Sequence, residues 1–130
     1  MTFTKPDSDH FRAQREEKPW GHEILWAWGE TYVGKLLHVR KGESLSLQYH
    51  ERKDETFSVL SGSALLVHGP SAGALAERTM GPGDCFHVTP GTLHRLVARE
   101  DTDLVEVSTP EIDDVVRLAD RYGRAAEPLG

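Results

Sequence analysis

The sequence predicts an all-β domain, folded as a sandwich or barrel around a single core. Its 130 residues suit one domain. Short runs rich in β-branched and aromatic residues recur along the chain, and clusters of Gly, Pro, Ser and Asp separate them. This pattern is typical of antiparallel β architectures. The composition, 38% hydrophobic and 28% charged, favours a globular protein over a disordered one.

The expected elements follow in chain order. Residues 1–17 form a polar arm, residues 18–124 the domain and residues 125–130 a tail. Strands are predicted at 22–28, 32–39, 44–50, 55–60, 64–68, 74–80, 85–88, 94–98 and 103–108. A short C-terminal helix should follow, with Thr109 as N-cap and Pro110 at the first helical position. Apolar residues recur at helical spacing from Ile112, and Gly123 suits the end of the helix.

Charge and cysteine content restrict the partners and the compartment. The formal net charge is −6, from 15 basic and 21 acidic residues, and a field of that sign repels nucleic acids and anionic membranes. We therefore expect neither as a partner. No apolar run approaches the roughly 20 residues of a membrane helix, and the N-terminus lacks the apolar region of a secretory signal. The one cysteine, Cys85, cannot form an intrachain disulfide, which fits a cytoplasmic protein.

Four residues are candidate metal ligands: Gln48, His50, Glu55 and His94. Gln48 and His50 stand two apart on a predicted strand and therefore share a face. The next four residues turn the chain, so that Glu55 can face back toward His50. A barrel can return the later strand that carries His94 to the same place. Two imidazoles, a carboxylate and an amide suit one divalent metal ion, with Zn, Mn, Fe, Co and Ni as the candidates.

Two spaced motifs resemble those of the cupin superfamily. The run Gly42-x5-Gln48-x-His50-x4-Glu55-x6-Gly62 resembles the first cupin motif, with Gln48 where many cupins have histidine. The run Gly83-x7-Gly91-x2-His94 resembles the second. There Thr89 and Pro90 stand where the family usually has proline and a small residue, but the spacing to His94 is kept. The resemblance implies a single cupin barrel, which is a double-stranded β-helix or jelly roll.

The similarity is greater to one branch, the cupin domain of type II mannose-6-phosphate isomerases, and covers about residues 18–124. The segments that carry it are Lys18-Pro19-Trp20-Gly21, Leu45-Ser46-Leu47-Gln48-x-His50, His94-Arg95-Leu96, Asp113-Asp114-Val115-Val116-Arg117 and Tyr122-Gly123-Arg124. In many relatives this domain follows a sugar-nucleotide transferase domain. The 130 residues hold no counterpart of it, so we do not expect the transferase activity.

The resemblance implies a metal-dependent isomerase acting on a sugar or sugar phosphate. A divalent ion would stabilise the enediol of an aldose–ketose conversion, and a base must move the proton. Glu106 is the candidate base if Val105 and Val107 face the core between the layers; an exposed strand glutamate is the alternative. Arg95, in the His-Arg pair that resembles the family's, is a second catalytic candidate, with a surface ion pair as the alternative.

Three further residues are candidates for substrate binding: Lys35, His87 and Arg124. Lysine and arginine suit an anionic group such as phosphate, although simple solvation is the alternative for both. His87 either lines the pocket or makes an ordinary hydrogen bond.

Two other functions stay open at this point. An iron-dependent cupin dioxygenase could use two histidines and a carboxylate, although Gln48 in place of a third histidine argues against it. A non-catalytic sugar- or metabolite-binding module is the other, because a fold does not fix a function. All three functions imply a small-molecule ligand. Pairing of residues 18–28 with a second barrel would give a homodimer, as in many cupins.

Overall fold

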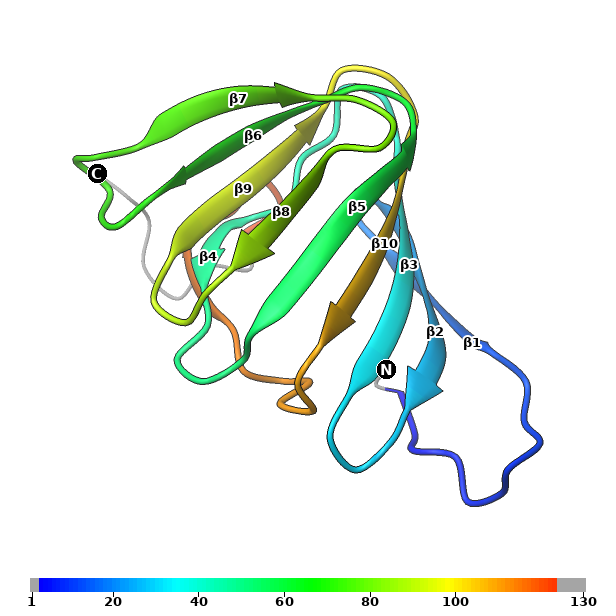
Figure 1. Ribbon diagram of the computed structural model, residues 1–130. Coiled ribbons are helices and arrows are strands. Elements are labelled where there is room, and N and C mark those ends of the chain that lie inside the picture. The colour runs from blue at the N-terminus through cyan, green and yellow to red at the C-terminus, as the bar shows by residue number, and fades with distance from the viewer. Residues whose placement is uncertain (1–2, 124–130) are drawn as a thin grey trace.

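Two antiparallel sheets face each other in the computed structural model, which describes residues 3–123 (Figure 1). One sheet has the strand order β1-β2-β3-β10-β5-β8 and the other β11-β4-β9-β6-β7. The strands are β1 (Gln14–Lys18), β2 (Gly21–Trp28), β3 (Val33–Val39), β4 (Leu47–Tyr49), β5 (Glu55–Ser61), β6 (Ala64–Gly69), β7 (Ala76–Met80), β8 (Cys85–Val88), β9 (Leu93–Ala98), β10 (Thr102–Ser108) and β11 (Val116–Ala119). The predicted all-β class is confirmed, and each predicted strand overlaps one of these.

Alternation along the strands separates a buried face from an outer face. In β5, Glu55, Phe57 and Val59 are buried, while the residues between them are only half-buried. The inner faces meet in one apolar core, made of Trp20, Leu37, Val39, Phe57, Val59, Ala64, Leu66, Met80, Val88, Leu96, Ala98 and Leu104. Burial of these side chains is the main favourable term in folding. The core contains the last residues of β9 and the middle of β5, so the first residues of both strands are left to line a cavity.

The tight turn between β5 and β6 depends on Gly62. Its φ of +97° lies in the left-handed region, which favours glycine. A Cβ atom added there would stand 2.3 Å from the carbonyl oxygen of Asp101. The last glycine of the first motif is therefore required by a close backbone approach.

The predicted C-terminal helix is wrong. Residues 3–123 contain no helix, and therefore none that is long and apolar enough to cross a membrane. Residues 110–114 instead form consecutive turns, and Val116–Ala119 forms β11, which pairs with β4. The spacing of the apolar residues suits a helix locally, but the open edge of β4 supplies backbone partners that a helix would leave unused. Tertiary pairing thus overrides the local preference.

The end of the predicted N-terminal arm also belongs to a sheet. Gln14–Lys18 forms β1 and pairs with β2 along its whole length, from Gln14 opposite Leu25 to Lys18 opposite Gly21. The side-chain amide of Gln14, the first residue of β1, also makes two hydrogen bonds with the backbone of Thr4 and so holds the preceding segment. The segment therefore folds back along the edge of the larger sheet.

Candidate metal centre

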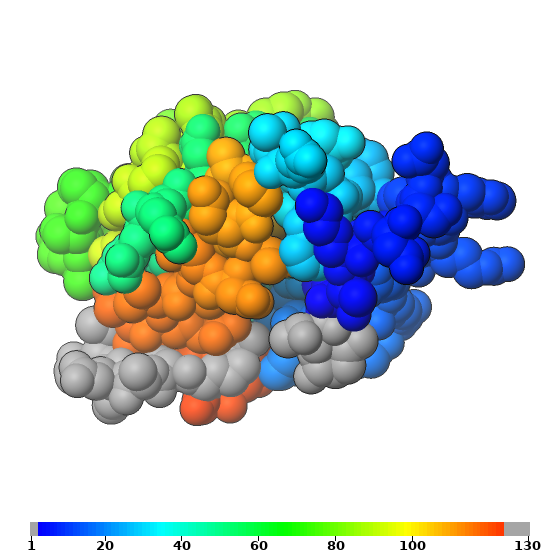
Figure 2. Space-filling model, turned by 90° about the horizontal axis from the view of Figure 1, so that it is seen from below, coloured from blue at the N-terminus to red at the C-terminus, as the bar shows by residue number. Residues whose placement is uncertain are grey.

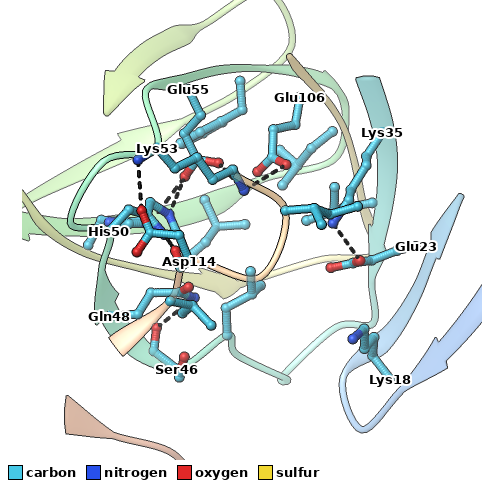
Figure 3. A pocket seen from close by; sticks show the side chains of 18 of the residues that line it. Lys18, Glu23, Lys35, Ser46, Gln48, His50, Lys53, Glu55, Glu106 and Asp114 are labelled. Carbon is cyan, nitrogen blue, oxygen red and sulfur yellow. Dashed lines mark hydrogen bonds and ion pairs between the residues drawn. The ribbon is translucent and has the colours of Figure 1, made fainter. Parts of the chain in front are cut away.

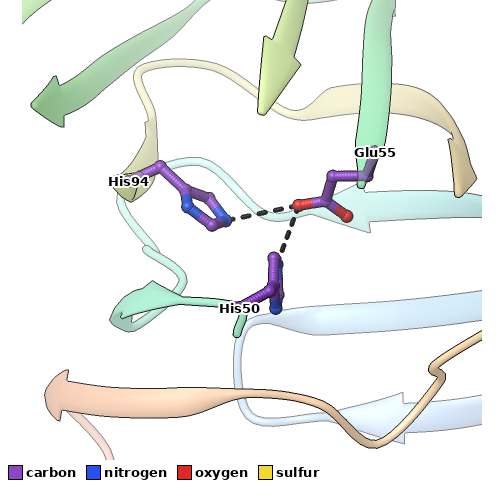
Figure 4. A group of neighbouring side chains, drawn as sticks. All are labelled: His50, Glu55 and His94. Carbon is purple, nitrogen blue, oxygen red and sulfur yellow. Dashed lines mark hydrogen bonds and ion pairs between the residues drawn. The ribbon is translucent and has the colours of Figure 1, made fainter. Parts of the chain in front are cut away.

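Three side chains from separate segments lie close together between the sheets (Figure 4). His50 follows β4, Glu55 begins β5, and His94 lies near the start of β9. Glu55 Oε1 lies 3.0 Å from His50 Nε2 and 3.3 Å from His94 Nε2. The candidate ligand atoms all lie within 4.8 Å of one another, and all three residues are buried. The structure thus brings together three of the four predicted ligands.

The two imidazoles are oriented through their other ring nitrogens. His50 Nδ1 lies 2.6 Å from the carbonyl oxygen of Asp114, and His94 Nδ1 lies 3.0 Å from that of Thr92. A carbonyl oxygen only accepts hydrogen bonds, so each Nδ1 carries a hydrogen. In a neutral imidazole Nε2 then presents a lone pair to Glu55 Oε1, and this contact requires a second proton or a cation between the atoms. A divalent ion fits, because ligand atoms about 2.1 Å from an ion and at right angles lie about 3 Å apart.

Gln48 lies beside this group. It stands directly opposite His94 in the pairing of β4 with β9, and residues paired in this way share a face of the sheet. It lines the cavity, and its amide Nε2 lies 3.5 Å from the carbonyl oxygen of Ser46, at the limit of a hydrogen bond. The amide is held only weakly and can turn its oxygen toward the three side chains. A ligand role for Gln48 stays a prediction.

Asp114 fixes the turn that follows β4 (Figure 3). Its carboxylate accepts hydrogen bonds from the backbone N–H groups of residues 51, 52 and 53, at 3.1, 2.7 and 2.9 Å. Its carbonyl oxygen is the acceptor for His50. Partial burial alone would raise the pKa of Asp114, but the three backbone donors outweigh it, so the pKa lies below its usual value. One residue therefore orients both a candidate ligand and the turn that leads to the next one.

A cavity of about 440 Å³, lined in part by the three side chains of the candidate metal centre, lies between the sheets, and its volume is within the size range of small-molecule sites. Charges of alternating sign line its wall on the six-stranded sheet (Figure 3). Lys53 Nζ lies 3.2 Å from Glu55 Oε2 and 3.7 Å from Glu106 Oε2. Further along, Lys35 Nζ lies 3.2 Å from Glu23 Oε1. Both lysines are buried and each has a carboxylate partner, so the wall offers donors and acceptors side by side.

Burial and neighbouring charges perturb three of these groups. Burial raises the pKa of Glu106 to about 8, and the charge of Glu55 adds to this effect. Burial alone would also raise the pKa of Glu55, but hydrogen bonds from His50 and His94 hold it well below its usual value. For Lys53, burial alone would lower the pKa, yet the charges of Glu106 and Glu55 outweigh burial and raise it. Adjacent carboxyl groups with diverging pKa values are typical of sites that handle protons.

The N-terminal residues reach the same cavity. Phe3 lines it, and the Phe3 ring centroid lies 5.3 Å from Lys35 Nζ, within cation–π range. Figure 2 shows the first described residues of the chain, in dark blue, close to the segment that follows β10, in orange. The start of the described chain therefore contributes an aromatic side chain to the cavity, in addition to the residues of the candidate metal centre.

The predicted base Glu106 faces the cavity from β10, with its side chain 13% exposed. The alternative of an exposed strand glutamate therefore does not hold. Its neighbour Val107 is 50% exposed on the outer face of the sheet, so it does not face a core between the layers as the prediction supposed. Lys35, predicted to bind substrate, also lines the cavity and stands directly opposite Glu106 across the β3–β10 pairing. The roles of both residues stay predictions.

The three remaining predicted residues differ in position. Arg95 lines the cavity, and its Nη2 lies 3.4 Å from the carbonyl oxygen of Ala119 in β11. His87 is exposed on β8 with its Nε2 2.6 Å from Asp54 Oδ1, and it lies outside the cavity lining. Arg124 lies outside the described residues. The structure thus associates Arg95 with the cavity wall and His87 with an ordinary surface contact.

Two important residues were not predicted as part of the site, although Asp114 stands in a segment that carries the resemblance. Lys53 stands in a polar four-residue turn, where lysine is ordinarily solvated, yet it is 6% exposed. Asp114 stands in the segment predicted as helix. A position two residues before a candidate ligand is the only hint that Lys53 provides. The backbone N–H of Lys53 donates to the carboxylate of Asp114, 61 residues away, and this contact is not visible in the local sequence.

Comparisons with known proteins agree with the two motifs. A family model described as "Cupin domain" matches residues 35–109. The chain is 35% identical over 127 residues to mannose-1-phosphate guanylyltransferase from Escherichia coli (strain K12), and 30% identical over 116 residues to alginate biosynthesis protein AlgA from Pseudomonas aeruginosa. These matches cover 92% and 85% of this chain but 26% and 23% of the relatives. The chain therefore spans about a quarter of the length of these curated relatives.

Solved structures share the fold at lower identity. KdgF from Halomonas sp. superposes with a TM-score of 0.65 at 21% identity, covering 78% of this chain and 87% of that chain. Oxalate decarboxylase from Lactobacillus farciminis gives a TM-score of 0.70 at 17% identity, covering 82% of this chain and 33% of that chain. Similarity at identities this low shows a shared fold and nothing more about function. With the family model spanning both motifs, the two facing sheets establish that this chain belongs to the cupin family.

Proposed function

We propose that this chain is a metal-dependent isomerase of a sugar or sugar phosphate. The observation that carries the proposal is the convergence of His50, Glu55 and His94 beside the buried carboxyl group of Glu106 in one cavity. The names of the curated relatives, which refer to mannose-1-phosphate and to alginate and xanthan biosynthesis, support a sugar-related ligand. Because those relatives are about four times as long, their names support the ligand class and no complete activity.

His50, Glu55 and His94, with Gln48 beside them, would hold the ion. When bound, a divalent ion would polarise the carbonyl and hydroxyl oxygens of the substrate. A metal-binding role also accounts for the paired Nδ1 contacts, which direct both Nε2 lone pairs at one point. This ligand set suits Zn, Mn, Fe, Co and Ni, which all accept nitrogen and oxygen donors.

Glu106 is the proposed base. An aldose–ketose conversion moves one proton between adjacent carbons, and the group that carries it must both take it and return it. A carboxyl group in a buried cavity suits this task, because burial brings its pKa near neutrality. Lys53, 3.7 Å from Glu106 Oε2, keeps this carboxyl group in place. Alternating donors and acceptors along the wall suit the hydroxyl groups of a sugar.

The test is turnover by metal-loaded protein in D₂O. Mannose 6-phosphate, fructose 6-phosphate and the free aldoses and ketoses are supplied with each of the five ions, and NMR follows deuterium entry next to the carbonyl carbon. We expect conversion and exchange that depend on the ion. Glu106→Gln should retain stoichiometric metal and lose at least about 100-fold in rate. Metal-loaded protein that neither converts nor exchanges any of these sugars would reject the isomerase.

A non-catalytic sugar-binding module is the second candidate. The observation that favours it is the ion pairing of Glu106 with Lys53, which occupies the proposed base. Calorimetric titration of metal-loaded protein with the same sugars separates the two functions. Saturable binding without exchange favours the module, and exchange at any rate above that of the free ion favours the enzyme.

A further inference from the structure

Lys53 is an unusual lysine, because its ammonium group lies inside the protein. Its side chain is 8% exposed, while the adjacent residues 51 and 52 of the same turn are exposed. Burying an ammonium group is costly unless it is paired. Its partners are the oxygens of Glu55 and Glu106, at 3.2 and 3.7 Å. The chain therefore places a fixed positive charge directly against a candidate metal ligand.

The turn is built so that this lysine points inward. The Asp114 carboxylate accepts the N–H groups of residues 51–53. At the end of the turn, Asp54 donates its N–H to Thr109 Oγ1 and accepts the N–H of Thr109, both at 3.0 Å. These bonds fix the backbone on both sides of Lys53. Its buried side chain then extends inward, and Nζ at its end reaches Glu55 and Glu106.

The two oxygens of Glu55 face different partners. Oε1 faces the Nε2 atoms of His50 and His94. Oε2 faces Lys53 Nζ, in an ion pair whose angles fall outside hydrogen-bond geometry. One oxygen is thus directed to the metal side and the other to the lysine side.

We propose that Lys53 is a positioning residue of the metal centre. Its ammonium group pairs with Glu55 Oε2, so that Glu55 presents only Oε1 to the ion. Lys53 also supplies a positive charge that keeps Glu55 and Glu106 together when no ion is bound. Both effects follow from its position between two buried carboxyl groups. The inference rests on the metal-binding part of the proposed function and is independent of isomerase activity.

The test compares two variants that differ only at Lys53. Glu106→Leu removes the second carboxyl group, and Lys53→Met/Glu106→Leu removes the lysine as well, so that neither variant leaves two buried carboxylates unpaired. Both are loaded with cobalt(II), and cobalt-edge X-ray absorption reports the total number of nitrogen and oxygen ligands and the distance to the carboxylate carbon, which is shorter when both oxygens bind. We expect the double variant to gain a second Glu55 oxygen, while Glu106→Leu retains one.

Affinity provides the second readout. Removing a like charge a few ångströms from a divalent ion should tighten cobalt binding at least about tenfold in chelator competition. Lys53→Arg in the natural background keeps the charge, and we expect it to retain the wild-type spectrum and an affinity within about threefold. If the double variant fails to fold, Lys53→Met is compared with the wild-type chain by the same two measurements.

The outcomes separate this inference from the proposed function. An unchanged cobalt spectrum without Lys53, or binding at least tenfold weaker in a folded variant, overturns the positioning role. A wild-type chain that binds no cobalt removes the metal centre and this inference with it. A normal metal centre without sugar turnover rejects the isomerase and leaves the role of Lys53 intact.

Discussion

The candidate metal centre is built from two regions of different character. The ligand segment, residues 48–55, supplies three of the four predicted ligands and the turn between them. The support segment, residues 109–119, supplies no candidate ligand, yet its backbone and carboxylate contacts orient His50 and fix the turn. Three of the four predicted donors are therefore close together in sequence, whereas their geometry depends on a segment about 60 residues away.

The largest expected effect comes from the ligand segment. His50→Ala removes one of two imidazoles that face Glu55 Oε1, so stoichiometric metal binding should be lost. The measurement is metal content after dialysis against each ion, with calorimetry for affinity. His87→Ala is the matched control, because His87 is exposed and contacts Asp54 outside the cavity. Full metal content in His50→Ala would show that this group of side chains is not the metal site.

An intermediate effect is expected from the support segment. Asp114→Ala removes the acceptor of three backbone N–H groups but keeps the carbonyl oxygen that orients His50. We expect a loss of about 2 kcal/mol in the free energy of unfolding, because the turn loses charged hydrogen bonds. Metal affinity should fall about tenfold, as is typical when groups that orient ligands are changed.

Asp113→Ala is the control for that change. Asp113 is the exposed neighbour of Asp114 and makes no side-chain hydrogen bond among those found in residues 3–123. Asp113→Ala should therefore keep the stability and metal affinity of the wild-type chain, whereas Asp114→Ala should lower both. Denaturant unfolding and metal titration of the two variants measure this difference. Equal behaviour of the two would mean that the carboxylate of Asp114 has no special part in the support segment.

The sequence predicts the ligand segment well, because two-residue periodicity and one short turn are local rules. Gln48 and His50 share a strand face by that periodicity, and the spacing to Glu55 follows from the turn. The position of His94 opposite Gln48 depends on long-range pairing and becomes visible through the second motif. The cupin barrel itself follows from these motifs together with the regular turn signals.

The support segment could not be predicted in the same way. Its apolar residues suit a helix by spacing, and only the open edge of β4 makes a strand preferable. The turn that carries Lys53 is held by hydrogen bonds to Asp114, which lies in the segment expected to be helical. One wrong local assignment therefore hid both the hydrogen-bond acceptor and the buried lysine. Errors of this kind are expected where a segment is held by distant partners rather than by its own periodicity.

The smallest effect is expected at Thr109, the first residue of the support segment, and it shows whether this residue also helps to hold the turn. Thr109→Val keeps the shape of the side chain but removes the hydroxyl that accepts the N–H of Asp54. The backbone bond from Thr109 N–H to the Asp54 carbonyl remains, so the turn should loosen and stay in place. We expect a loss of about 1 kcal/mol in unfolding free energy and a change in metal affinity of less than about threefold.

Thr79→Val is the matched control for Thr109→Val, because Thr79 is exposed on β7, far from the turn in the sheet order. It should leave both stability and metal affinity unchanged. The graded series from His50 through Asp114 to Thr109 then distinguishes two forms of support. If Thr109→Val weakens metal binding as strongly as Asp114→Ala, the turn is a single rigid unit in which any lost contact displaces Glu55. If it costs stability alone, the carboxylate of Asp114 is sufficient to hold the turn, and the contacts between Thr109 and Asp54 serve only to extend the pairing of β10 with β5.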